Sequence, residues 1–176
     1  MMFARRDAAV RAVSERRAPR VLDVGSGSGR VGELMLEAGA GRYLGIDFSE
    51  PMTELARARL ARFRDRAELR TANFLEADLG DRFDVVVALG LFDYIEDPVP
   101  FARRMAELCA DVTIASFPRW DWVKGPIRRA KYRVVNDCPI FDYTPRELDF
   151  LFRSAGFARV AQEVRRTGIL LHAFAH

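Results

Sequence analysis

An acidic residue and three alternating glycines follow a short apolar run near the start of the chain. Asp23 lies within the run 21–24, and Gly25, Gly27 and Gly29 come directly after it, with Ser26 inside the loop. An apolar run bounded by turn residues is typical of a buried parallel strand, and glycines leave no side chains between the backbone and a ligand. The helical pattern that follows would direct free backbone N–H groups towards the same gap. The spacing therefore predicts a ligand-binding strand, turn and helix.

Two classes of ligand compete for this loop. Residues 27–32 read Gly-Ser-Gly-Arg-Val-Gly and satisfy the dinucleotide fingerprint. Asp23 argues against a dinucleotide, because a carboxylate beside the turn repels a pyrophosphate and attracts a cation. S-adenosylmethionine carries an ammonium and a sulfonium and has no phosphate, so Asp23 favours this ligand over a nicotinamide or flavin dinucleotide.

A second acidic residue ends the next predicted strand, residues 42–46. Asp47 follows the first glycine by about twenty residues, the spacing at which a carboxylate meets a ribose in a βαβ unit. Such a carboxylate can accept hydrogen bonds from both ribose hydroxyls. S-adenosylmethionine and NAD share that diol, so Asp47 indicates a nucleoside without choosing between them.

With the run FDVVVALGLFDYI at residues 83–95, these features resemble the class I S-adenosylmethionine-dependent methyltransferases. The resemblance extends from about residue 20 to the end and is strongest in the glycine loop and in this run. It implies a set of cofactor-binding residues, namely Asp23, Gly25, Ser26, Gly27, Gly29, Asp47, Phe48, Asn73, Phe74, Ala88, Leu89 and Gly90. It also places Asp93 and Tyr94 near the transferred methyl, as catalytic residues. Two alternatives stay open, because Asp93 could equally cap a turn and Asn73 could be an ordinary turn residue.

The hydrophobic patterns predict an α/β fold: a doubly wound, mostly parallel seven-stranded sheet with helices on both faces. Residues 83–89 are nearly all apolar, as in a central parallel strand covered on both sides. The runs 157–164 and 168–175 are joined by so short a link that they must pair as a C-terminal antiparallel hairpin.

Helices are predicted between these strands. Residues 1–18 are compatible with one N-terminal helix, and residues 144–147 form a capping box that begins the last helix. After Asp47, apolar residues at helical spacing predict one buried helix face made of Met52, Leu55, Ala56, Leu60 and Phe63.

Regularity lapses between residues 118 and 143, a segment rich in aromatic and basic residues. A connection this long is usually functional or disordered, and it leaves the carboxyl end of a strand, where open α/β sheets bind ligands. We predict that this insertion caps the substrate, with Trp120, Trp122, Arg128, Tyr132 and Tyr143 as substrate-binding residues. The aromatics could equally fill the core under a loop, and the cations could form a solvated face.

The 176 residues are 49% hydrophobic with a net charge of +3, which suits a single domain over residues 1–176. No apolar run is long enough to span a bilayer, so we expect a cytoplasmic protein without integral membrane association. Cys109 and Cys138 lack metal-ligand spacing, so no metal is expected and both are interpreted as packing residues. His172 is interpreted as a packed histidine.

The predicted function is methyl transfer from S-adenosylmethionine to an oxygen, nitrogen or carbon of a small-molecule acceptor. Nucleic acid is disfavoured as a partner, because the Asn-Pro-Pro-Tyr type stretch that the family uses for amino groups of bases is missing. One alternative is a non-catalytic S-adenosylmethionine-binding subunit, completed by a partner subunit or a second copy. The other is an NAD-linked oxidoreductase, which would need a Tyr-x-x-x-Lys or histidine arrangement that the sequence lacks.

Overall fold

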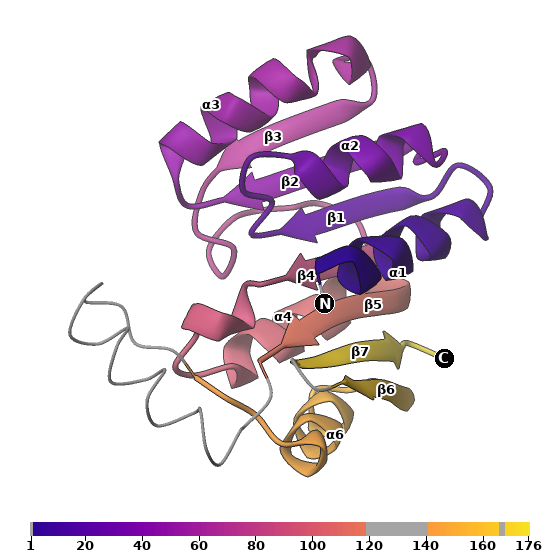
Figure 1. Ribbon diagram of the computed structural model, residues 1–176, viewed down its shortest axis with the longest axis vertical. Helices are drawn as coiled ribbons and strands as arrows, with labels where there is room; N and C mark the ends of the chain where they lie inside the picture. Colours follow the sequence, from indigo (N-terminus) through magenta and orange to yellow (C-terminus); the bar gives the residue numbers. More distant parts are fainter. Residues whose placement is uncertain (1, 119–140, 166–167) are drawn as a thin grey trace.

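A computed structural model describes residues 2–118, 141–165 and 168–176 of the chain. One sheet runs through this part of the molecule, in the order β3-β2-β1-β4-β5-β7-β6 (Figure 1). The strands are β1 Arg20–Val24, β2 Arg42–Asp47, β3 Ala67–Thr71, β4 Phe83–Leu89, β5 Cys109–Phe117, β6 Arg159–Arg165 and β7 Gly168–Phe174. The first five pair in parallel, and β7 lies antiparallel between β5 and β6. The predicted fold class is therefore confirmed.

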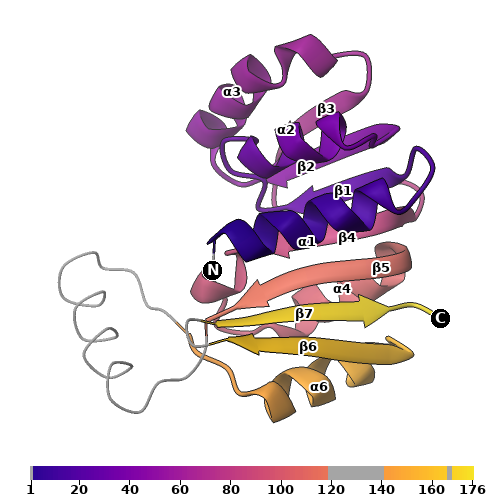
Figure 2. The same cartoon turned by 45° about the vertical axis from the view of Figure 1, so that its right-hand side comes forward.

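Helices cover the sheet on both faces (Figures 1 and 2). On one face lie α1 Met2–Ser14, α2 Arg30–Glu37 and α3 Glu50–Arg59, and on the other lie α4 Val99–Leu108 and α6 Pro145–Ser154. Two short 3-10 turns complete the described elements, η1 Ala61–Phe63 and η2 Phe92–Tyr94. Among the described residues, none of the helices has the length and apolar character needed to cross a membrane.

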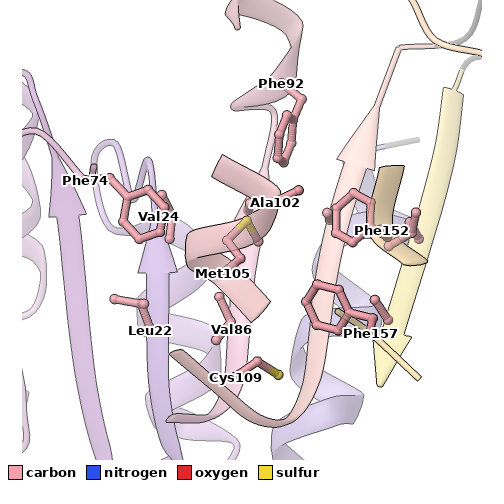
Figure 3. Packing of buried hydrophobic residues seen from close by; sticks show 14 of the residues in the cluster. Leu22, Val24, Phe74, Val86, Phe92, Ala102, Met105, Cys109, Phe152 and Phe157 are labelled. Carbon is pink, nitrogen blue, oxygen red and sulfur yellow. The ribbon is translucent and has the colours of Figure 1, made fainter. Parts of the chain in front are cut away.

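The sheet separates two hydrophobic clusters, because side chains alternate along each strand. Towards α4 and α6 the core is built around Leu22, Val86, Met105 and Phe152 (Figure 3). In the same cluster the rings of Phe92 and Phe117 stack with their centroids 4.5 Å apart. A smaller cluster faces α1 and α2, where the other side of the same strands packs against Ala9, Val13 and Met35. Burial on both faces explains why residues 83–89 are apolar except for Asp84, whose Oδ2 accepts from the backbone N–H of Arg20.

Two local predictions are confirmed by the contacts. Helix α6 begins with the capping box, in which Thr144 Oγ1 accepts from the backbone N–H of Glu147 while the Glu147 side chain accepts from that of Thr144. Cys109 is fully buried and free, as a packing residue should be, whereas Cys138 lies outside the described residues. His172 is half-buried, and burial lowers the pKa of its imidazole.

The predicted apolar face of the helix after Asp47 is wrong in part. Met52 and Leu55 are 43% and 55% exposed, while the polar Thr53 is buried. Thr53 can take an inward position because its hydroxyl donates to the backbone oxygen of Ser49, one turn back. The helix contacts the body of the domain through Thr53, Ala56 and the following Leu60, so its outer apolar residues are left for another surface.

The connection between β3 and β4 leaves part of the sheet uncovered. Residues 72–82 form turns rather than a helix, although a parallel crossover of this kind usually carries one. The side chains of β3 on that face are polar, and Arg70 Nε pairs with Glu68 Oε1 at 2.6 Å. This face of the sheet is therefore exposed to solvent at β3 and covered by packed side chains at β4 and β5.

Candidate functional site

The carboxyl ends of β1 to β4 meet at one edge of the sheet and surround a cavity of about 600 Å³. Open parallel sheets bind ligands at this edge, where the strand order reverses between β1 and β4. The walls are mostly apolar, and come from the loops that follow all four strands. The lining residues are Val24, Gly25, Ile46, Asp47, Phe48, Ser49, Met52, Ala72, Asn73, Phe74, Gly90, Leu91, Tyr94, Ile95 and Phe101.

The glycine loop is fastened to the end of β2. The backbone N–H groups of Gly25 and Ser26 both donate to the carbonyl of Ile46, at 2.8 and 3.1 Å. Gly25, Gly27 and Gly29 have φ angles of 72°, 52° and 74°, in the left-handed region that disfavours other residues. A side chain at Gly27 would meet nothing within 4 Å, so this turn presents bare backbone to open space.

Gly29 has a different role from the other two glycines. It forms the N-cap of α2, and a Cβ at this position would lie 3.1 Å from that of Ala56 in α3. The glycine therefore allows α2 and α3 to approach closely and does not contact the cavity. Its place in the predicted cofactor-binding set is architectural in this structure.

Asp47 joins the two loops that border the cavity. Its Oδ2 accepts from the backbone N–H of Gly27 at 2.8 Å, and its Oδ1 accepts from that of Ser49 at 2.9 Å. Each carboxylate oxygen can accept two hydrogen bonds, so one position on each oxygen remains for a ligand. The two remaining acceptors match the pair of hydroxyls on a ribose.

Asp23 lies behind the glycine loop and does not line the cavity. It is 3% exposed, and the hydroxyl of Tyr43 donates to its Oδ2 at 2.8 Å. Burial raises the pKa of Asp23 to about 7, while the hydrogen bond from Tyr43 lowers it and the nearby charge of Asp47 raises it. The residue therefore sits beneath the loop as a carboxyl that changes charge near neutral pH.

Aromatic side chains form the walls of the cavity. Phe74 is buried and stacks on Phe101 with ring centroids 5.8 Å apart, so this wall is part of the core. Phe48 also lines the cavity and is 84% exposed, and Met52 is partly exposed. The cavity is therefore bordered both by a buried aromatic ring and by an exposed one.

Asn73 lines the cavity and also stabilises its own turn. Its amide donates to Glu76 Oε1 at 2.6 Å, and its side-chain oxygen accepts from the backbone N–H of Leu75 at 3.1 Å. Asn73 is therefore a turn residue that also lines the cavity, so its role in the turn does not conflict with the predicted role in cofactor binding.

The fourth predicted segment brings Gly90 and Tyr94 to the cavity. Gly90 has φ 80°, and its backbone N–H donates to the buried Ser116 Oγ at 2.9 Å, which fixes this turn against β5. Ala88 is fully buried within β4, and neither it nor Leu89 lines the cavity.

Tyr94 and Asp93 belong to η2, which closes the cavity on the β4 side. Tyr94 lines the cavity and is 55% exposed. Asp93 does not line the cavity, and its backbone oxygen accepts from the N–H of Phe141 at 3.1 Å. The structure therefore brings only Tyr94 of the two predicted catalytic residues to this space.

Tyr143 borders a separate, smaller hollow of about 260 Å³. Its hydroxyl donates to the carbonyl of Ile95 at 3.0 Å, and burial together with Asp93 and Asp97 raises its pKa to about 12. Of the predicted substrate-binding residues it alone is described. Trp120, Trp122, Arg128 and Tyr132 lie outside the described residues, as does most of the predicted cap.

No group of histidine, cysteine and acidic side chains that could hold a metal ion occurs in the described part of the chain. Several cavity residues are not identified by the sequence patterns, notably Met52, Leu91, Ile95 and Phe101. Met52 carried a misleading signal, because its spacing suggests a buried helix face. The other three follow a predicted strand end or begin the next helix, and only their place in the fold directs them to the cavity.

A second hollow of about 470 Å³ lies at the opposite edge of the sheet, where β1 to β4 begin. Its lining residues include five arginines and three large apolar residues: Arg20, Arg42, Arg64, Arg66, Arg70, Leu44, Leu79 and Phe83. Counter-ions lie among these cations, since Arg20 pairs with Asp81 at 3.5 Å and Arg70 with Glu68. We refer to it as the amino-edge groove.

Known proteins are similar to this chain in sequence and in fold. A family model described as a methyltransferase domain matches residues 22–113, which carry the glycine loop, Asp47 and β4. The ubiquinone biosynthesis O-methyltransferase of Nitrosospira multiformis is 33% identical over 90 residues, covering 50% of this chain and 37% of that protein. The chain thus matches well under half the length of this curated relative.

Solved structures are similar over nearly the whole chain. Magnesium protoporphyrin IX methyltransferase from Synechocystis, crystallised with S-adenosylhomocysteine, has a TM-score of 0.76 at 18% identity, covering 97% of this chain and 83% of that one. An S-adenosylmethionine-dependent methyltransferase from Mesorhizobium loti has a TM-score of 0.75 at 19% identity, covering 95% and 96%. The family match spans the loops that build the cavity, and the chain, whose fold is that of S-adenosylmethionine-dependent methyltransferases, belongs to the methyltransferase domain family.

Proposed function

We propose that this chain transfers a methyl group from S-adenosylmethionine to an oxygen, nitrogen or carbon of a small-molecule acceptor. The observation that carries the proposal is the Asp47 carboxylate. It is held by two backbone N–H groups at the edge of an apolar cavity, with one acceptor position left on each oxygen. A nucleoside with a free diol and an apolar base satisfies both features.

The residues around the cavity fit this cofactor. Asp47 would hold the ribose hydroxyls, and Phe48, Met52 and Phe74 provide the apolar surfaces that an adenine ring requires. Gly25 and Gly90, both with positive φ, allow a ligand to approach the backbone closely between them. Bound S-adenosylmethionine supplies a methyl group on a sulfonium, which a nucleophile displaces in line.

The chain's own part in this chemistry is to orient the reactants and exclude water. Leu91, Ile95 and Phe101 line the cavity on the side of β4 with apolar side chains, and a dry site strengthens every electrostatic contact inside it. Tyr94, which lines the cavity and is partly exposed, is the side chain placed to contact an acceptor. A neutral tyrosine can orient a hydroxyl or amine by hydrogen bonding and can pass a proton to solvent. Asp93 stays a prediction as its neighbour in this role.

A small-molecule acceptor is supported by the names of similar proteins. One is an O-methyltransferase of ubiquinone biosynthesis and another methylates magnesium protoporphyrin IX. Trp120, Trp122, Arg128, Tyr132 and Tyr143 belong to the proposal as acceptor-binding residues. The cytoplasmic location is likewise part of the proposal and rests on the sequence alone.

A non-catalytic subunit remains a second candidate because of one observation. Phe48, Met52 and Leu55 form an exposed apolar strip on and before α3, immediately beside the cavity. Strips of this kind are found where a second chain completes a site. The two candidates differ in one measurable property, since both bind the cofactor and only one turns it over.

Calorimetric titration with S-adenosylhomocysteine and, in parallel, with NADH tests the proposed cofactor. We expect saturable binding of the homocysteine nucleoside and no heat from NADH. Binding of NADH alone would reverse the choice made for the loop, and absence of both would leave the cavity without its proposed ligand.

Methyl transfer is then measured with radiolabelled S-adenosylmethionine and a panel of phenols, hydroxylated quinones and tetrapyrroles. Turnover of any of them supports the enzyme, whereas binding without turnover supports the subunit. Trp122→Ala should lower acceptor use more than cofactor affinity, and Arg153→Gln, an exposed arginine on α6, serves as the unaffected control.

A further inference from the structure

A buried pair of polar side chains lies directly beneath the glycine loop. Tyr43 and Asp23 are 1% and 3% exposed, and the tyrosine hydroxyl donates to Asp23 Oδ2 at 2.8 Å. They come from neighbouring parallel strands, since Tyr43 pairs with Val21 in the register of β1 and β2. The site proposed above uses the cavity side of these strands, so this pair has no role in it yet.

Two glycines make room for the tyrosine. A Cβ on Gly32 of α2 would lie 2.5 Å from the Tyr43 ring carbon Cζ and hydroxyl, a distance that real side chains do not adopt. A Cβ on Gly45 would lie 3.0 Å from the same hydroxyl. The space around the ring therefore fits a tyrosine and little else, so its hydroxyl is held at one place against Asp23.

The pair is connected to the loop by Ser26. The Ser26 hydroxyl interacts with that of Tyr43, and its backbone N–H donates to Ile46 at 3.1 Å. Ser26 precedes Gly27, whose N–H is held by Asp47. Removing the Tyr43 hydroxyl should therefore affect first the Asp23 carboxyl and the glycine loop, because these are the groups that it contacts.

Few charged groups face Asp23. The hydrogen bond from Tyr43 favours its ionised form, while burial and the charge of Asp47 favour its neutral form. In the sheet register Asp23 lies opposite Val87 of β4. Tyr43 and Val87 belong to the smaller hydrophobic cluster, to which α1 and α2 contribute the uncharged Ala9, Val13 and Met35. From α1 the cation Arg5 lies beside Gly90. Tyr43 is thus the group that most directly stabilises a negative charge on Asp23.

We infer that Tyr43 is a positioning residue for the cofactor's positive charge: by donating to Asp23 it keeps an anion beneath the glycine loop, so that the site favours a cationic ligand over a neutral nucleoside. The inference rests on the proposed cofactor. It concerns a residue that does not touch the cavity and acts only through Asp23 and the loop. Its consequence is selectivity between ligands that share an adenosine group and differ in charge.

The test compares S-adenosylmethionine with 5′-methylthioadenosine, which keeps the adenosine and carries neither the sulfonium nor the ammonium. Tyr43→Phe fills the same space and removes only the hydroxyl. At pH 7.5 we expect it to weaken S-adenosylmethionine by about tenfold, the size of one charge-assisted hydrogen bond, with 5′-methylthioadenosine changed less than about twofold. Calorimetry or fluorescence titration measures both ligands on each variant.

Asp23→Asn provides the matched variant that has no proton to lose. Its preference for S-adenosylmethionine over 5′-methylthioadenosine should be reduced at pH 7.5, as in Tyr43→Phe, but its carboxamide gains no charge as the pH rises. Tyr43→Phe should regain S-adenosylmethionine affinity relative to Asp23→Asn between pH 6.5 and 8.5, as its carboxyl ionises. Because both variants bind the same ligand at each pH, the ligand's own titration cancels. Thr113→Val, which removes a buried hydroxyl from β5, should change neither affinity.

A purely structural role predicts a different result. If Tyr43→Phe weakens both ligands equally, or neither, or if its loss does not depend on pH, then the inference is wrong. Should this variant fail to fold, the wild-type protein and Asp23→Asn decide together, because the preference of the wild-type protein for S-adenosylmethionine over 5′-methylthioadenosine must then rise, relative to that of Asp23→Asn, between pH 5.5 and 7.5. Failure of the wild-type protein to bind either ligand would instead overturn the proposed function.

Discussion

The two edges of the sheet carry hollows of comparable size and opposite chemistry. At the carboxyl edge the cavity is lined mainly by apolar residues, and its polar centre is one carboxylate held by backbone N–H groups. At the amino edge the groove is lined by five arginines, several of which pair with acidic side chains or donate to backbone carbonyls. The amino-edge groove thus has more charged residues, whereas the cavity at the carboxyl edge has a carboxylate that backbone hydrogen bonds hold in a fixed position.

The difference follows from the direction of a parallel sheet. Loops that leave the strands turn into helices and can fold over a ligand, with free N–H groups at the helix starts. At the other edge the chain enters the strands, and the groove is lined by residues at or near the strand starts and in the segments that precede them. Arg20 and Arg42 are direct neighbours in the β1 and β2 register, although they lie far apart in the sequence. Fixed backbone donors, rather than charge, distinguish the binding edge.

The largest expected effect tests whether the wall of the cavity is part of the core. Phe92 is fully buried and stacked on Phe117, and it directly follows the cavity-lining Leu91 in the sequence. Phe92→Ala should reduce the free energy of unfolding by about 3 to 5 kcal/mol, the usual cost of emptying an aromatic core position. Urea denaturation followed by circular dichroism measures it. Phe150→Ala, at a position that is 75% exposed, is the control and should stay within about 0.5 kcal/mol of wild type.

The next effect concerns the buried carboxyl behind the loop. In the folded state the pKa of Asp23 is about 7, above its ordinary value of 3.8. Between these two pH values the folded protein therefore keeps a proton on Asp23 that the unfolded chain has already released. Stability should therefore decline as pH rises from about 4 to 7, by up to about 4 kcal/mol, and Asp23→Asn should remove this decline. Unfolding curves for both proteins at pH 4.5, 6 and 7.5 give the comparison. Parallel pH profiles would show that Asp23 is ionised throughout.

The comparison is sharpened by matched acidic variants at the two edges. Asp47→Ala removes two hydrogen bonds to the backbone and the proposed acceptor for the ribose, and should weaken S-adenosylhomocysteine by about 100-fold, or about 2 to 3 kcal/mol. Asp65→Ala, beside the amino-edge groove, should leave that affinity unchanged. Titration calorimetry measures both. Equal losses would mean that affinity follows overall charge rather than the Asp47 geometry.

The smallest effect is expected at the amino-edge groove. The side chains of Arg42 and Arg64 make no hydrogen bond or ion pair within residues 2–118, 141–165 and 168–176, and both are exposed. The double change Arg42→Gln with Arg64→Gln should alter stability by less than about 0.5 kcal/mol and leave cofactor affinity as it was. A clear drop in either property would show that the two edges are coupled, against the picture drawn from the contacts.

Much of the fold could be predicted because its signals are local. The apolar run 83–89 gives β4 without error, and Thr144 and Glu147 identify the start of α6 from four residues. The link between β6 and β7 is too short for anything except an antiparallel pair. These features depend on neighbours in the sequence, where the pattern and the structure share the same residues.

What escaped prediction depends on contacts between distant residues. The sequence suggested Asp23 as a direct attraction for a cationic ligand, and nothing local shows that Tyr43 reaches it from β2. Gly32 and Gly45 are equally silent, since their lack of a side chain matters only once the tyrosine ring is in place. The exposure of Leu55 was missed for the same reason, because helical spacing cannot tell which face has a partner.

The position of β7 has a consequence for how the chain is made. It lies between β5 and β6, so β6 cannot join the sheet until β7, which follows it in the sequence, has paired with β5. During synthesis on the ribosome, the edge of β5 must therefore wait, unpaired, for residues 168–174. Unpaired strand edges are where nascent chains aggregate, so chaperone dependence should be greatest before residues 168–174 have been made. A ribosome stalled just before residue 168 would hold the binding edge nearly complete on a sheet that is still open.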